Sequence, residues 1–349
     1  MRHPALAFAM FVLGALLALP ASAPAQPLRG VNLAGAEFGN AIPGNVNIDY
    51  VWPTTQEIDH FASRGMNVVR VPFRWERMQP VLGGSLAAAH LASLDALVAH
   101  ATSRGVTVVL DPHNYARYNG TVIGPGGAVT HAHFADFWSR LALHYAGAPQ
   151  VVFALMNEPH GLPTEQWLDS ANAAIAAIRA AGATQLVLVP GNGWTGAHSW
   201  HSDWYGTPNA QVMGNVVDPL GHYAFELHQY FDQDYSGTSP TCRSEAGTGT
   251  SQLQGVTAWL RERGLRGFLG EFAGADNDDC RIAVQNALAH MDANADVWLG
   301  WSWWAAGPWW GDYMFTLEPD GSGDRPQMPW LTPWLGTSPQ ALFANGFEP

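Results

Sequence analysis

The chain has 349 residues, of which 47% are hydrophobic and 13% are charged, and its formal net charge is −13. This length allows one large barrel or two ordinary domains with a sizeable core. With only 16 Lys and Arg against 29 Asp and Glu, the composition argues against nucleic-acid binding. The 16 Trp and nine Tyr favour a sugar ligand, because flat aromatic faces pack against the C–H faces of sugar rings, although about half of the Trp are expected in the core.

The N-terminus has the layout of a secretory signal peptide. Arg2 precedes an apolar run over residues 5–19 and a stretch of small residues over 21–25, with cleavage expected after Ala25. The run is too short to span a bilayer comfortably, and no second apolar run of about twenty residues follows. We therefore expect an exported protein, extracellular or periplasmic, that is free of the membrane once cleaved. In an oxidising compartment Cys242 and Cys280 are expected to form a disulfide, the alternative being two free thiols.

From residue 28 onward, strands alternate with helices. The expected strands cover residues 28–33, 67–73, 106–110, 151–156, 185–189, 223–227, 266–269 and 297–301. The clear helices between them cover residues 55–64, 91–104, 132–145, 164–181, 252–263 and 282–293. A fifth helix is hard to discern between residues 194 and 221, and the last, near 327–335, is broken by prolines.

Eight strands, most of them followed by a helix, predict parallel strands joined by right-handed crossovers. A spacing of roughly 38 residues per unit is reasonable for a (β/α)8 TIM barrel with long loops. We expect one such barrel over residues 26–337, after a signal peptide over 1–25 and before a C-terminal tail over 338–349, acting as a monomer. A doubly wound open sheet is the alternative, but no Gly-x-Gly-x-x-Gly follows the first strand.

The stretch over residues 151–160, Val-Val-Phe-Ala-Leu-Met-Asn-Glu-Pro-His, is the most informative. Its first six residues are apolar, as in a strand buried on both faces. Pro159 cannot donate to a sheet, so the strand should end there and leave Glu158 at its carboxyl end, where barrels place their chemistry. A carboxylate emerging from so apolar a strand is poorly solvated, which favours its protonated form and suits it to act as a general acid. The alternative is a buried glutamate satisfied by neighbouring amides.

Further polar and aromatic residues fall at the ends of other strands, and in a barrel all these ends share one face. Glu271 ends the seventh strand, 113 positions after Glu158, so the two carboxylates should face each other across the mouth. Two facing carboxylates with an aromatic platform suit glycoside hydrolysis. If Arg70 lies beside Glu271, its guanidinium should hold the pKa of that carboxyl down, which leaves Glu158 as the acid.

Four motifs occur in order at these strands: Arg70-x-Pro72, Asn157-Glu158-Pro159-His160, His228-x-Tyr230 and Gly270-Glu271-Phe272. Together they resemble glycoside hydrolase family 5, in particular its endo-β-1,4-glucanases (cellulases), over nearly the whole mature chain. The resemblance implies a (β/α)8 barrel, retention of anomeric configuration, and no metal or organic cofactor. It also implies Glu158 as acid/base and Glu271 as nucleophile. The substrate-binding residues that it implies are Arg70, His113, Asn157, His228, Tyr230 and Trp304.

Specific roles follow from the same resemblance. Arg70 and Tyr230 would hydrogen-bond the nucleophile, and Asn157 would contact the 2-hydroxyl of the sugar being cleaved. The two histidines would line that subsite. Trp304 would stack under the sugar, although the adjacent Trp303 leaves the register open.

Each assignment has a structural alternative. Arg70 can be an ion-pair partner without a catalytic role, and His113 and His228 can be satisfied core histidines. Candidates for outer sugar platforms that can equally be packing residues are Trp194, Trp204, Trp309 and Trp310. We expect cellulose or mixed-linkage β-glucan as substrate. The alternatives are mannan, xyloglucan or xylan cleaved by the same chemistry, and a barrel that binds polysaccharide without cleaving it.

Overall fold

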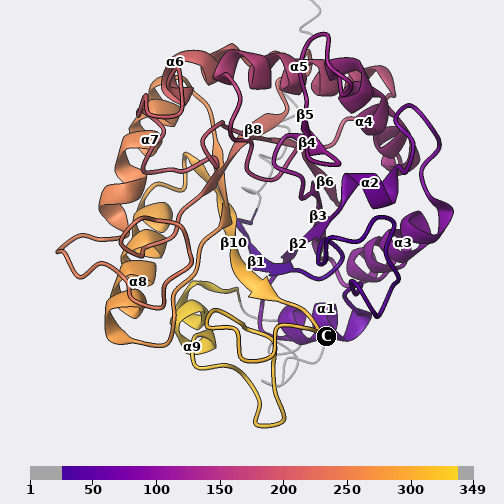
Figure 1. The fold of residues 1–349 in the computed structure, drawn as a ribbon. Coiled ribbons are helices and arrows are strands. Elements are labelled where there is room, and N and C mark those ends of the chain that lie inside the picture. Colours follow the sequence, from indigo (N-terminus) through magenta and orange to yellow (C-terminus); the bar gives the residue numbers. More distant parts are fainter. Residues whose placement is uncertain (1–25, 337–349) are drawn as a thin grey trace, which may run out of the picture.

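The computed structural model describes residues 26–336, which form a closed barrel of eight parallel strands surrounded by helices (Figure 1). The order around the barrel is β1-β10-β9-β8-β7-β6-β3-β2, so the first and last strands pair and close it. This confirms the predicted (β/α)8 barrel and contradicts the open sheet. The expected signal peptide and the expected tail over 338–349 lie outside the described residues. The barrel strands are β1 (Leu28–Leu33), β2 (Val68–Phe73), β3 (Thr107–Pro112), β6 (Val151–Ala154), β7 (Val187–Pro190), β8 (Tyr223–His228), β9 (Gly267–Glu271) and β10 (Trp298–Ala306).

The predicted helices are present, with ends that differ by at most four residues. Figure 1 shows them as a ring outside the strands. Their apolar stripes pack on the outer face of the barrel, which gives each helix its buried side. The long helices are α1 (Thr55–Ser63), α3 (Ala88–Ser103), α4 (His131–Tyr145), α5 (Thr164–Ala180), α7 (Thr250–Glu262) and α8 (Asp278–Ala293).

Where sequence periodicity was weak, the helices are short. The fifth crossover contains only α6 (Asn209–Val212) and η1 (Met213–Asn215), and the eighth contains α9 (Met328–Leu331) and η2 (Thr332–Trp334). Three short elements were not predicted: α2 (Trp75–Met78), and the antiparallel pair β4 (Arg117–Tyr118) and β5 (Thr121–Val122). Two-residue strands leave too short an alternation of apolar and polar residues to be recognised in a sequence.

The barrel interior has an apolar layer beneath a polar layer. The apolar part is a buried cluster of Val68, Val109, Val152, Ala154, Leu188, Ala224 and Phe268. Because strand side chains alternate between faces, a residue two positions later points the same way, one layer nearer the carboxyl ends. On β2, β3 and β8 those next residues are Arg70, Asp111 and Glu226, all fully buried. These strands therefore place charged side chains inside the barrel, just below the opening at the carboxyl ends of the strands.

The loops above the mouth are held partly by a disulfide. Cys242, in the loop after β8, is bonded to Cys280, in the first turn of α8, with a Cα–Cα distance of 5.0 Å. The predicted disulfide is therefore confirmed. It ties the loop that follows His228 to the segment that follows Glu271.

Candidate active site

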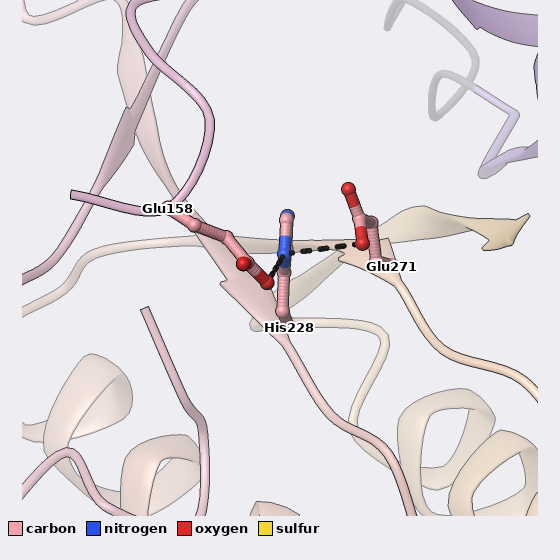
Figure 2. Close-up of side chains that lie close together, drawn as sticks. All are labelled: Glu158, His228 and Glu271. Atoms are coloured by element: carbon pink, nitrogen blue, oxygen red, sulfur yellow. Dashed lines mark hydrogen bonds and ion pairs between the residues drawn. The ribbon is translucent and has the colours of Figure 1, made fainter. Parts of the chain in front are cut away.

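Glu158 and Glu271 meet at the carboxyl end of the barrel, on either side of His228 (Figure 2). One carboxylate oxygen of each glutamate and one ring nitrogen of His228 all lie within 4.8 Å of one another. Glu158 follows β6 with a positive φ of 41°, an uncommon conformation for a residue other than glycine. Its side chain is 16% exposed, whereas that of Glu271, the last residue of β9, is 5% exposed. The predicted meeting of the two carboxylates across one rim is thus observed.

Both oxygens of Glu271 face donors. Nη1 of Arg70 donates to Oε1 at 3.1 Å, and the hydroxyl of Tyr230 donates to Oε2 at 2.7 Å. Burial raises the pKa of Glu271, although His228 and Arg70 act in the opposite direction. Arg70 lowers this pKa, as expected, but desolvation outweighs its effect, so the pKa of Glu271 lies above its ordinary value. The ionised form still fits these contacts, since Arg70 and Tyr230 donate to its two oxygens.

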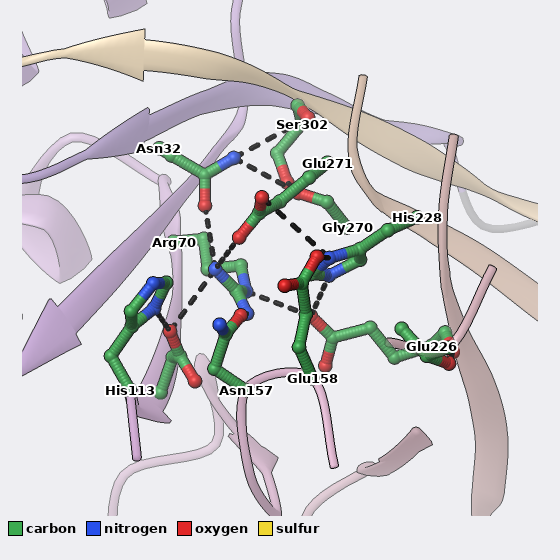
Figure 3. A network of polar contacts seen from close by, with 12 residues as sticks. Asn32, Arg70, His113, Asn157, Glu158, Glu226, His228, Gly270, Glu271 and Ser302 are labelled. Atoms are coloured by element: carbon green, nitrogen blue, oxygen red, sulfur yellow. Dashed lines mark hydrogen bonds and ion pairs between the residues drawn. The ribbon is translucent and has the colours of Figure 1, made fainter. Parts of the chain in front are cut away.

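Arg70 is the centre of a buried polar network (Figure 3). Besides Glu271, its Nη1 lies 3.0 Å from Asp111, and its Nε lies 2.8 Å from Glu226. Its remaining nitrogen, Nη2, donates to Oδ1 of Asn157 at 2.9 Å. These carboxylates raise the pKa of Arg70 against the effect of burial, so it stays charged. The guanidinium thus connects β2 to β3, β8 and β9 and to Asn157, which follows β6.

His228 lies between carboxylates at both of its ring nitrogens. Nδ1 is 2.8 Å from Oε1 of Glu158 and 3.6 Å from Oε2 of Glu271, and Nε2 is 3.3 Å from Oε1 of Glu226. Burial alone would lower the pKa of His228, but the three carboxylates outweigh burial and raise it to about 10. A doubly protonated imidazole has no lone pair for a metal ion. Although Glu158, His228 and Glu271 are close enough to be considered as a metal site, the protonated imidazole of His228 favours an acid–base role.

His113 and Trp304 stack on each other beside the buried Asp111. Nδ1 of His113 is 2.7 Å from Oδ2 of Asp111, and burial holds the pKa of His113 well below its ordinary value, so this imidazole is neutral. The ring of Trp304 stacks on that of His113, with centroids 5.4 Å apart. Trp303 is fully buried, and its indole donates to the carbonyl of Phe315. Of the two, Trp304 is the one that is not fully buried, so it remains the predicted sugar platform.

Asn157 leaves one donor unused next to the pair of glutamates. Its Oδ1 accepts from Arg70, whereas its Nδ2 is buried without a hydrogen-bond partner among the described residues. Beside Glu158 lies a cavity of about 460 Å³, lined among others by Trp194 and Trp204, whose rings stack 5.7 Å apart. Both tryptophans are exposed, at 42% and 59%. A buried donor and an open aromatic wall suit a ligand that carries both hydroxyls and C–H faces.

Sequence reasoning missed three fully buried polar residues of this network. Asn32, on β1, accepts from Arg70 through Oδ1 and donates to the carbonyl of Gly270. Asp111 and Glu226 each stand two positions before an inward histidine on their strands. A signal for them existed, since a carboxylate inside an otherwise apolar strand requires a buried partner. Sequence alone did not show that this partner is Arg70.

The family described as cellulase (glycosyl hydrolase family 5) matches residues 26–307. Endo-beta-1,4-glucanase B of Aspergillus niger is 44% identical over 296 residues, which cover 84% of this chain and 86% of that protein.

Two solved structures are similar over most of the chain. The endo-beta-1,4-glucanase Xac0029 from Xanthomonas axonopodis pv. citri is 45% identical with a TM-score of 0.85, covering 90% of this chain and 99% of that one. The structure of XacCel5A in complex with cellopentaose is 46% identical with a TM-score of 0.85, covering 88% and 99%. The match to the family, the identity to these relatives and the shared barrel lead to one conclusion: the chain belongs to the cellulase family, glycosyl hydrolase family 5.

Proposed function

We propose that this protein is a retaining endo-β-1,4-glucanase that cleaves internal bonds of cellulose or mixed-linkage β-glucan. The observation that carries the proposal is the approach of Glu158 and Glu271, whose nearest carboxylate oxygens lie within 4.8 Å at the mouth of the barrel. Retaining glycosidases hold their two carboxyl groups about 5–5.5 Å apart, and inverting ones about 6.5–9.5 Å. The relatives named as endo-β-1,4-glucanases and the cellopentaose complex support the choice of substrate.

The reaction has two displacements. In the first, a carboxylate oxygen of Glu271 bonds to the anomeric carbon while the glycosidic C–O bond breaks, and Glu158 transfers its proton to the leaving oxygen. In the second, Glu158 takes a proton from water, whose oxygen bonds to the anomeric carbon as the bond to Glu271 breaks. Arg70 and Tyr230 hold Glu271 in place, and Nδ2 of Asn157, which has no hydrogen-bond partner within residues 26–336, would donate to the 2-hydroxyl. Both carboxylates come from one barrel, so a monomer suffices.

Release of reducing ends from a panel of polysaccharides tests the choice of substrate. Soluble β-1,4-glucan and mixed-linkage β-glucan should yield reducing ends together with a rapid fall in viscosity, because cuts are internal. Mannan, whose 2-hydroxyl is axial, should yield at least about tenfold less. The same is expected of xyloglucan, whose glucan backbone is branched, and of xylan, which lacks the hydroxymethyl group. Faster cleavage of mannan would overturn the substrate assignment. Binding to glucan without any product would favour the non-catalytic barrel.

The raised pKa of Glu271 predicts the pH below which kcat/KM falls. The first displacement requires ionised Glu271, so kcat/KM should be present above its raised pKa and fall as the pH drops through it. The acid limb is therefore expected above pH 4.5, the ordinary value for a glutamate. In Tyr230→Phe, which removes a hydrogen bond to the ionised form, the limb should move to still higher pH. A limb below pH 4.5, or a profile that is flat in acid, would contradict this assignment.

We also propose that the protein is exported. The signal-peptide pattern over residues 1–25 supports export. The disulfide between Cys242 and Cys280 suits an oxidising compartment. Within residues 26–336, the helices are all too short or too polar to cross a bilayer.

A further inference from the structure

Two carboxylates of the polar network are not used by the double displacement. Asp111 and Glu226 are fully buried, both contact Arg70, and each stands two positions before an inward histidine. Their histidines differ in charge. His113, beside Asp111, has its pKa held well below the ordinary value by burial, whereas that of His228, beside Glu226, is raised to about 10.

The two carboxylates differ as well. Burial raises the pKa of Asp111 to about 7. Burial acts in the same direction on Glu226, but Arg70 and His228 outweigh it and hold the pKa of Glu226 below its ordinary value. Negative charge is thus fixed on Glu226, at Nε2 of His228. The Glu226 carboxylate fits in this place only because residue 270, on β9, is a glycine. A Cβ at that residue would lie 2.4 Å from Oε1 of Glu226.

The geometry restricts the protons of His228. A neutral imidazole has one N–H and one lone pair, so it cannot donate at both nitrogens. With an ionised carboxylate at Nε2, a neutral ring would carry its proton there and present the lone pair of Nδ1 to Glu158, only 2.8 Å away. That lone pair would attract the acid proton of Glu158. When the ring carries a second proton, the direction of this hydrogen bond is reversed: Nδ1 donates and Oε1 of Glu158 accepts.

We propose that Glu226 is a positioning residue that, together with Glu271, keeps His228 doubly protonated, so that Nδ1 donates to Oε1 of Glu158 and the acid proton of Glu158 stays on Oε2. Among the described residues, Oε2 has no hydrogen-bond partner, and Glu158 lines the cavity beside it. This inference rests on the proposed function of Glu158. The charged or titratable groups that surround His228 are Arg70, Asp111, His113, Glu158, Glu226, Tyr230 and Glu271.

The test compares two substrates that differ in their need for an acid. The leaving group of cellotetraose needs a proton, and that of 2,4-dinitrophenyl β-cellobioside does not. Glu226→Gln should lower kcat/KM by about 100-fold on cellotetraose, the order of a general-acid contribution, but by less than about tenfold on the aryl glycoside. Asp111→Asn is the matched control. It removes another buried carboxylate that contacts Arg70, one that is hydrogen-bonded to His113 and not to His228, so it should lower both rates by similar factors.

A spectroscopic readout separates positioning from folding. In protein labelled with ¹⁵N-histidine, with His228→Asn used for assignment, both ring nitrogens of His228 should remain protonated at about pH 8, where an ordinary histidine is neutral. In Glu226→Gln one nitrogen should lose its proton. A neutral His228 in the wild type overturns the proposal, and so does an equal loss of Glu226→Gln activity on both substrates. If the proposed function fails, the wild type cleaves neither substrate, while the spectrum still tests the link between Glu226 and His228.

Discussion

Glu271→Ala should lower kcat on β-glucan by at least about 10⁴-fold, the order found when a catalytic nucleophile is removed from other hydrolases. Without its carboxylate, no bond to the anomeric carbon can form in the first displacement. The fold should tolerate the change, because Arg70 keeps Asp111 and Glu226 as ionic partners. Turnover measured beside far-UV circular dichroism separates lost chemistry from lost folding.

Azide should restore activity to the Glu271→Ala variant, which tests the role of the missing carboxylate. The space left by the Glu271 side chain admits a small anion to the same face of the sugar, so azide should restore cleavage of an aryl cellobioside and give the α-glycosyl azide. Glu262→Ala, which removes an exposed glutamate at the end of α7, is the control and should match the wild type. Full activity of Glu271→Ala without azide would remove this residue from the role of nucleophile.

Arg70→Met should lower the free energy of unfolding by about 3–5 kcal/mol, the cost of leaving buried charges without their partner. The guanidinium contacts three buried carboxylates, those of Asp111, Glu226 and Glu271. A methionine fills much of the volume but neutralises none of them. Urea unfolding of the variant and the wild type measures the difference directly.

The dependence of this loss on pH identifies its cause. In Arg70→Met the folded-state pKa values of the buried carboxylates rise, so the missing stability should be greater at about pH 7 than at about pH 5, where protonation removes the charges. A deficit that is equal at both pH values would indicate lost packing instead. Arg104→Met, which breaks the half-exposed pair with Asp59, should change the free energy of unfolding by less than about 1 kcal/mol at either pH.

The sequence predicted the barrel because its elements follow local rules. Apolar runs end at prolines or polar residues, and α1 and α3 end just before a glycine with positive φ, Gly65 and Gly105. The short α6 and α9 were not resolved because a single turn has no periodicity to detect. The strand before Glu158 ends at Ala154, two residues earlier than expected, since apolar residues stay buried after the pairing stops.

The sequence predicted where the site residues lie better than it predicted their protonation states. Parallel strands bring their carboxyl ends together, so Glu158, Glu271 and His228 could be placed on one rim from their strand positions alone. The pKa of Glu271 could not be derived from one neighbour, because burial and His228 act on it together with Arg70. The role of Glu226 depends on distances to two strands that are remote in sequence.

The configuration of the first product tests the central claim most directly. Nearest carboxylate oxygens within 4.8 Å suit direct attack by Glu271 and leave too little room for the water of an inverting reaction. Proton NMR of cellotetraose during the first minutes of hydrolysis should show the new reducing end as the β-anomer, with the α-anomer appearing later by mutarotation. Initial formation of the α-anomer would contradict the account.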